Sequence, residues 1–186
     1  LLPALATADH LLFSFEEGVA DWRVNVFGKG TLEFAETSDA GRGARAMLVR
    51  SQGLNGGNLI GPALAGGPWR LERHDRVRFH IRSPQPMTKA TLVFVTDEKT
   101  HPTYNLHVVI EREGWQELTF PLSRCWNRGQ QALDARRLQR IYVNPGQADA
   151  EFAIDEIELL AAARTVFLEP DRVLHAIATA TAPSID

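Results

Sequence analysis

The chain has 186 residues, of which 44% are hydrophobic and 23% charged, and its formal net charge is −3. These values are ordinary for one soluble globular domain. The basic residues are dispersed and form no stripe with interleaved aromatic residues, which argues against a nucleic-acid partner. No apolar run is long enough to span a membrane. The lone cysteine, Cys125, excludes an internal disulfide.

Short runs with strand character follow one another at regular spacing. In chain order they cover residues 11–15, 22–27, 31–36, 44–50, 58–64, 76–82, 90–96, 104–110, 116–120, 139–144 and 151–160. Turn-forming phrases separate them, such as Gly28-Lys29-Gly30 and Asn55-Gly56-Gly57. In run 76–82, apolar residues alternate with Arg and His, as in an antiparallel strand with one wet face. The pattern predicts an all-β, antiparallel β-sandwich, or jelly roll.

The strand-like runs define one predicted domain over residues 11–161. Residues 1–10 predict a signal-peptide remnant or a linker, because Ala6 and Ala8 are spaced as in a signal cleavage site. Residues 162–186 predict a linker or an interdomain tail. A secreted or periplasmic location is therefore expected.

Several phrases occur in a characteristic order along the chain. They are Phe15-Glu16-Glu17-Gly18 ahead of Trp22, Ser38-Asp39-Ala40-Gly41, Gly114-Trp115-Gln116, Ile141-Tyr142-Val143-Asn144 and Ile154-Asp155-Glu156-Ile157. Together they resemble a β-sandwich carbohydrate-binding module of the galactose-binding-like type, most nearly family eleven. Such modules are found at the N-terminus of polysaccharide-degrading glycosidases. The resemblance implies a non-catalytic domain, a polysaccharide or oligosaccharide ligand, and a covalently linked catalytic domain.

Carboxylates stand inside apolar strand patterns near both ends of the predicted domain. Burying such a charge is costly unless a cation or hydrogen-bond donors compensate it. The resemblance implies a structural Ca²⁺ held by Glu16 and Asp155, with Asp39 from the 38–43 turn, and oxygen ligands of this kind suit calcium. The alternative is that these carboxylates accept hydrogen bonds from backbone amides and Arg without a metal.

The ligand face is expected around Tyr142. If Ile141 and Val143 face the core, alternation turns Tyr142 and Asn144 outward, and related modules carry a ligand-stacking Tyr in the matching phrase. The alternative is a Tyr that merely covers the sheet. In the loop 123–128, Trp126 beside Arg124 predicts a ligand rim, with capping of the sandwich edge as the alternative.

A third group of candidate ligand-binding residues is Tyr104, His107 and Asp97. Alternation places Asn105 and His107 on one face of their strand and Tyr104 on the other, so Tyr104 is a core residue unless a bulge intervenes. A solvated surface histidine is the alternative for His107.

The arginines of two strands leave the ligand class open. Arg76, Arg78, Arg82 and Arg140 would suit an acidic or sulfated polysaccharide, but they can equally pair with the chain's acidic residues. The alternative functions are a protein-interaction or purely structural sandwich and a jelly-roll polysaccharide lyase. The lyase is disfavoured because no pair of carboxylates and no nucleophile motif stands out.

Overall fold

A computed structural model describes residues 9–64, 66–67, 73–96, 103–127 and 132–162. The strands are β1 (His10–Phe13), β2 (Arg23–Thr37), β3 (Ala46–Ile60), β4 (His74–Ser83), β5 (Thr88–Val95), β6 (Thr103–Ile110), β7 (Gly114–Pro121), β8 (Arg140–Pro145) and β9 (Ala150–Ala161). Two 3₁₀ turns, η2 (Leu122–Arg124) and η3 (Ala135–Arg137), lie between β7 and β8. No helix in this part of the chain has the length and apolar character needed to cross a bilayer.

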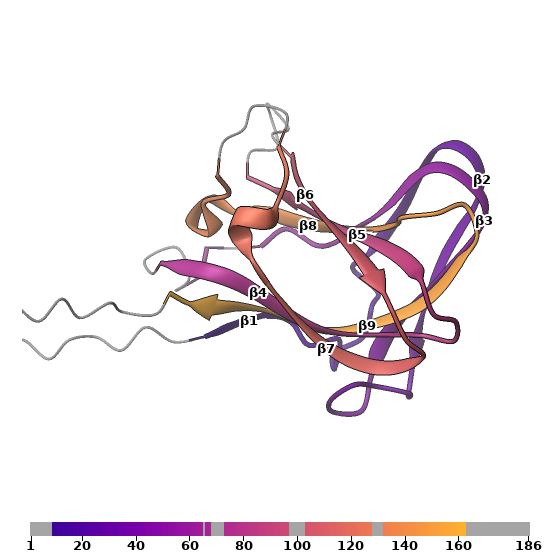
Figure 1. The fold of residues 1–186 in the computed structure, drawn as a ribbon, viewed down its shortest axis with the longest axis horizontal. Coiled ribbons are helices and arrows are strands. Elements are labelled where there is room, and N and C mark those ends of the chain that lie inside the picture. Colours follow the sequence, from indigo (N-terminus) through magenta and orange to yellow (C-terminus); the bar gives the residue numbers. More distant parts are fainter. Residues whose placement is uncertain (1–8, 65, 68–72, 97–102, 128–131, 163–186) are drawn as a thin grey trace, which may run out of the picture.

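The strands form one antiparallel sheet that curls into two layers (Figure 1). Its path is β6-β5-β8-β3-β9-β4-β7, with β1 attached to β9 and β2 attached to β3. The two layers share β3: its residues 59 and 60 pair with β8 in one layer, and its residues 47–51 pair with β9 in the other. We call β6, β5 and β8 with the adjoining ends of β2 and β3 the β5 layer, and the other half of the sheet the β4 layer. The predicted all-β antiparallel sandwich is confirmed.

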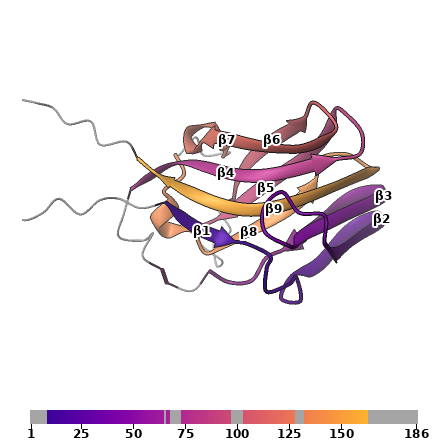
Figure 2. The same ribbon diagram turned by 90° about the horizontal axis from the view of Figure 1, so that it is seen from below.

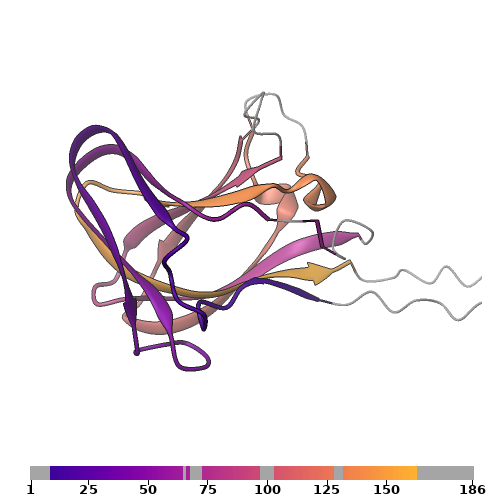
Figure 3. The same cartoon turned by 180° about the vertical axis from the view of Figure 1, so that it is seen from behind.

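The β2–β3 hairpin differs from the prediction, because each of its strands was expected to be two shorter strands. Lys29 pairs with Asn55, so the two glycine-rich phrases lie opposite each other in the middle of the hairpin and not at turns. A Cβ at Gly28 would lie 1.4 Å from the carbonyl oxygen of Asn55. Gly30 and Gly56 have φ angles of +90° and +97°. Glycine therefore lets both strands bend together from one layer into the other (Figure 3).

The core lies between the two layers. Its largest fully buried side chains include Phe94 from β5, Phe79 from β4 and Phe152 from β9. Trp22 packs against Phe13 at one side of this core and is 4% exposed, as its predicted packing role requires. Burial of these aromatic side chains supplies the main force that holds the layers together.

The first and last strands lie side by side, as predicted (Figure 2). β1 pairs with the end of β9 through His10 with Leu159, Leu11 with Glu158 and Phe13 with Ile157. Of the predicted terminal segments 1–10 and 162–186, residues 1–8 and 163–186 lie outside the described residues. The strands of the sandwich run from residue 10 to residue 161.

Candidate functional site

The outward face of the β4 layer consists largely of paired charges. Arg78 and Glu158 approach to 2.6 Å, and Arg82 forms an ion pair with Asp39. Further pairs are Arg76 with Asp75, Arg50 with Glu151, Arg42 with Glu156 and Arg45 with Glu36. For Arg76, Arg78 and Arg82, the structure confirms the alternative in which acidic residues of the same chain neutralise them. The arginines named here are thus neutralised by acidic residues of the same chain.

The outward face of the β5 layer has a different character and centres on Tyr142. On β8, Ile141 and Val143 are fully buried, and Tyr142 lies half-buried on the opposite side, as predicted. Tyr142 pairs with Ile60 of β3 on one side and with Val93 of β5 on the other. Arg23 of β2 pairs with Ile60, and Asn105 of β6 pairs with Val93, so one residue from each of the five strands lies in a line across the layer. We call these five residues the Tyr142 row.

A second, polar row runs beside the Tyr142 row. It consists of Asn25, Asn58, Asn144, Thr91 and His107, one from each strand of the layer. Asn144 Nδ2 donates a hydrogen bond to Asn58 Oδ1 at 2.9 Å. The Thr91 hydroxyl and His107 Nδ1 are hydrogen-bonded at 3.1 Å. These contacts position the side chains of Asn58, Asn144, Thr91 and His107 on the sheet.

The two rows together suit a ligand that has an apolar ring face and several hydroxyl groups. A Tyr ring offers a flat apolar surface that carries a polar hydroxyl at its tip. The amides of the polar row offer both donors and acceptors on the same face, whereas Thr91 is buried and positions His107. The sequence indicated Tyr142, Asn144 and His107 but missed Thr91, Asn58 and Asn25, because strand register cannot be read from one sequence.

A groove of about 500 Å³ lies at one end of the Tyr142 row. Its lining residues are Asp21, Arg23, Ile60, Gly61, Pro62, Ala63, Arg140 and Tyr142. Arg140 Nη1 donates a hydrogen bond to the carbonyl oxygen of Gly61 at 3.0 Å, which holds the guanidinium group beside the segment 61–63. The groove thus combines one aromatic ring with two guanidinium groups.

The loop after β7 brings Trp126 to the opposite end of the same row. The backbones of Trp126 and Asn105 exchange two hydrogen bonds of 2.8 Å, so Trp126 continues the layer beyond β6. Trp126 is 55% exposed. The guanidinium group of Arg124 instead lies over the ring of Phe120 at 5.1 Å, at the edge of the β4 layer. The structure therefore brings Trp126, but not Arg124, to the end of the Tyr142 row.

The remaining ligand candidates, Tyr104 and Asp97, are not placed on this face by the structure. Tyr104 is 5% exposed and packs in the core beside Phe94, because β6 has no bulge that would turn it outward. The structure thus corrects the placement of Tyr104 on the ligand face. Asp97 lies outside the described residues.

Burial raises the pKa of the Cys125 thiol to about 12, so this cysteine stays protonated and is a poor nucleophile.

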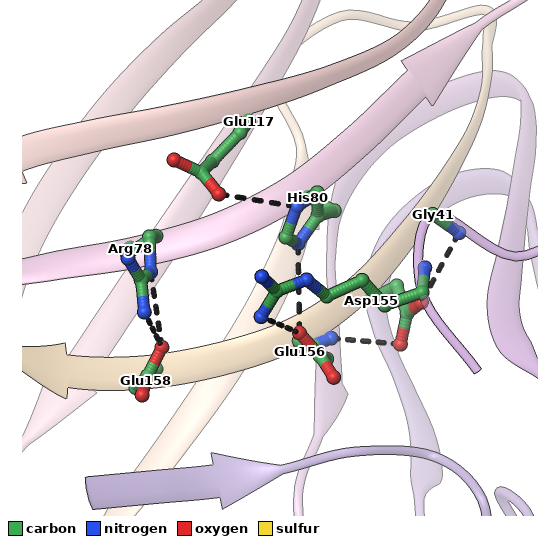
Figure 4. A network of polar contacts seen from close by, with 8 residues as sticks. Gly41, Arg78, His80, Glu117, Asp155, Glu156 and Glu158 are labelled. Carbon is green, nitrogen blue, oxygen red and sulfur yellow. Dashed lines mark hydrogen bonds and ion pairs between the residues drawn. The ribbon is translucent and has the colours of Figure 1, made fainter. Parts of the chain in front are cut away.

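Asp155 is fully buried in β9 and holds the loop between β2 and β3 (Figure 4). Its Oδ2 accepts hydrogen bonds from the backbone N–H groups of Gly41 at 3.1 Å and Arg42 at 2.9 Å. Its Oδ1 accepts a third from the N–H of Glu156 at 2.8 Å, where the backbone has a φ of 43°. Burial raises the pKa of Asp155, although these three amides act in the opposite direction.

Glu16 holds the same loop from the other end of the chain. Its Oε1 accepts hydrogen bonds from the N–H groups of Ala44 at 2.9 Å and Arg45 at 3.1 Å. We call Glu16, Asp155 and the loop 41–45 the carboxylate clamp. Asp39, next to this loop, accepts a hydrogen bond of 2.8 Å from Trp115 Nε1 and pairs with Arg82.

The carboxylate clamp does not fit the calcium site implied by the sequence. Calcium requires six to eight oxygen ligands around one point. Here Asp155 Oδ2 and Glu16 Oε1 each accept hydrogen bonds from two loop amides. Within the described ranges, no three His, Cys, Asp or Glu residues gather as they would around a metal ion. The geometry matches the alternative in which backbone amides and Arg satisfy the carboxylates.

Solved structures of carbohydrate-binding modules share this architecture. A family 11 module from a cellulosomal cellulase of Clostridium thermocellum aligns with a TM-score of 0.67 at 18% identity, over 87% of this chain and 99% of the module. A structure of a family 11 module from the same organism, in complex with a β-1,3-1,4-mixed-linked tetrasaccharide, gives a TM-score of 0.66 at 18% identity over 86% of this chain and 99% of that one.

An exo-β-agarase structure contains a similar sandwich, with a TM-score of 0.58 at 14% identity over 83% of this chain and 26% of the agarase. No family model matches this sequence, and no curated protein matches it. At these identities the comparison establishes the fold. The chain has the β-sandwich fold of family 11 carbohydrate-binding modules, as its sequence predicted.

Proposed function

We propose that this domain is a non-catalytic carbohydrate-binding module that binds a polysaccharide across the outward face of the β5 layer. The observation that carries the proposal is the Tyr142 row beside the polar row. A half-buried Tyr ring is flanked by hydrogen-bonded Asn144, Asn58, Thr91 and His107. This is the combination that a sugar ring and its hydroxyl groups require.

The described strands of this face lack the two carboxyl groups with which glycosidases hydrolyse glycosidic bonds. Glycosidases place two carboxyl groups about 5–10 Å apart across the bond. Residues 23–26, 57–60, 88–95, 103–110 and 140–145, which form this layer and are all described, include no Asp or Glu. Binding without cleavage is the function that this surface supports.

We also infer that the domain serves a linked polysaccharide-degrading enzyme outside the cytoplasm. The sandwich that makes up part of the exo-β-agarase chain supports this arrangement. Tethering would raise the local concentration of an enzyme on its polymer even if the domain binds weakly. In the full-length protein, deletion of the domain should slow degradation of insoluble polymer and leave soluble oligosaccharide degradation unchanged. Equal losses on both substrates would contradict the inferred accessory role.

Affinity electrophoresis through gels containing agarose, mixed-linkage glucan, xylan, alginate or pectin tests the proposal directly. We expect retardation by at least one polymer. Replacement of Tyr142 by Ala should then weaken binding by about 1–3 kcal/mol. Trp126→Ala should weaken it as well if the ligand reaches β6. Arg50→Ala, on the outward face of the β4 layer, is the matched control and should leave retardation unchanged.

Two results would contradict the proposal, one against sugar binding as such and one against the role of Tyr142. If no polymer retards the domain, the alternative of a protein-interaction or purely structural sandwich takes its place. If Tyr142→Ala lowers the melting temperature while retardation stays the same, Tyr142 covers the sheet and the ligand lies on another surface.

A further inference from the structure

Charge is distributed unequally between the two layers of the sandwich. The β5 layer carries Arg23, Lys89, His107 and Arg140, and its fully described strand residues include no Asp or Glu. The β4 layer, in contrast, carries acidic residues on β2 and β9 that pair with arginines, and Glu117 of β7 pairs with His80. A chain with a net charge of −3 thus keeps its candidate ligand face free of acidic strand residues.

This asymmetry bears on the kind of sugar that the face can bind. Carboxylates are strong acceptors for the hydroxyl groups of neutral sugars. A guanidinium group only donates, and its planar fork matches a carboxylate or a sulfate. Along the β5 layer, hydroxyl groups would find only neutral acceptors on the described strands, whereas an anionic group would find cations.

The groove beside Tyr142 concentrates these cations. Arg23 and Arg140 both line it, together with Tyr142. Arg23 is exposed at the start of β2, and Arg140 is held in place by its hydrogen bond to Gly61. Asp21 is the one acidic residue among the described residues that line the groove. The described lining thus offers two guanidinium groups and one carboxylate.

Building on the proposed polysaccharide binding, we infer that the ligand is an anionic polysaccharide. Its carboxylate or sulfate groups bind Arg23 and Arg140 while a neighbouring sugar ring packs on Tyr142. The polar row then binds the hydroxyl groups of the following ring. Uronic-acid polymers and sulfated polymers share this chemistry, and the experiment below separates them.

The test is calorimetric titration with oligosaccharides of matched length from polygalacturonate, from a sulfated carrageenan and from neutral mixed-linkage glucan. We expect one anionic series to bind at least about tenfold more tightly than the neutral one at low ionic strength. This preference should shrink several-fold at about 0.5 M salt, where exposed charges are screened. The series that binds more tightly identifies the anionic group as carboxylate or sulfate.

Three variants sharpen the test, because we expect one to weaken anionic binding, one to strengthen it and one to leave it unchanged. Arg23→Ala should weaken anionic binding about 5- to 10-fold and weaken any neutral binding much less. Asp21→Asn, in the same groove, should strengthen it about 2- to 3-fold, because a repelling charge is removed. Arg50→Ala is the control, since Arg50 is paired with Glu151 on the other layer and should have no effect.

Different results would contradict the anionic ligand and the proposed sugar binding. If neutral glucan binds as tightly as the anionic series and Tyr142→Ala weakens it while Arg23→Ala does not, the module binds sugar but the anionic class is wrong. If no oligosaccharide binds, the proposed function itself falls.

Discussion

Replacement of Asp155 by Ala tests the carboxylate clamp. The carboxylate is fully buried and accepts hydrogen bonds from Gly41, Arg42 and Glu156 at 2.8–3.1 Å. Its removal leaves the Gly41 and Arg42 amides without their acceptor, at about 1–3 kcal/mol for each. Loss of a buried charge partly offsets this cost, because burial disfavours the ionised carboxylate and raises its pKa. We expect the free energy of unfolding to fall by about 3 kcal/mol.

Urea denaturation followed by tryptophan fluorescence measures this change. A fall of about 3 kcal/mol should lower the melting temperature by about 6–12 °C in a domain of this size. Glu151→Ala is the matched control, because Glu151 lies on the same strand but forms an exposed ion pair with Arg50. That control should change stability by less than about 1 kcal/mol. A loss for Asp155→Ala no larger than that of the control would refute the clamp as a stabilising element.

Three further predictions concern pH, metal and the bent hairpin. Because the pKa of Asp155 is raised in the folded state, its contribution to stability is greatest below its unfolded pKa and is lost as pH rises through the folded pKa. The stability difference between the wild type and Asp155→Ala should therefore widen as pH falls from about 7 to about 4, and a narrowing difference would contradict the sign. Replacing EDTA with calcium should move the melting temperature by less than about 2 °C, whereas a rise that grows with calcium concentration would restore the metal site predicted from the sequence. Gly28→Ala should cost at least about 2 kcal/mol in a denaturation curve because its Cβ would overlap Asn55, while Gly66→Ala, with nothing within 4 Å, should be neutral; equal effects would show that the bend tolerates a side chain.

The fold was readable from the sequence because alternation fixes which side of a strand is buried. Ile141, Tyr142 and Val143 took their predicted sides, and the same rule placed Tyr104 in the core and His107 outside. The continuity of β2 was not readable, because glycine phrases that serve a bend inside a hairpin look the same as turns between strands.

The site was readable only in part, since its parts come from strands distant in sequence. Tyr142 and Asn144 share a phrase, but Thr91 and Asn58 join them through pairings that only the register establishes. The calcium prediction rested on the family resemblance and on the positions of the carboxylates in the sequence. Whether Glu16 and Asp155 face a cation or backbone amides depends on the path of the loop 41–45, which no residue pattern specifies.

The bent β2–β3 hairpin has a mechanical consequence. Since β3 pairs with β8 in one layer and with β9 in the other, neither layer can peel away without rupturing backbone hydrogen bonds of the shared strand. A pull on the β5 layer would thus be transmitted through the backbone of β3 to β9, which is held by β1 and by the clamp. A domain built in this way yields to load as a single unit.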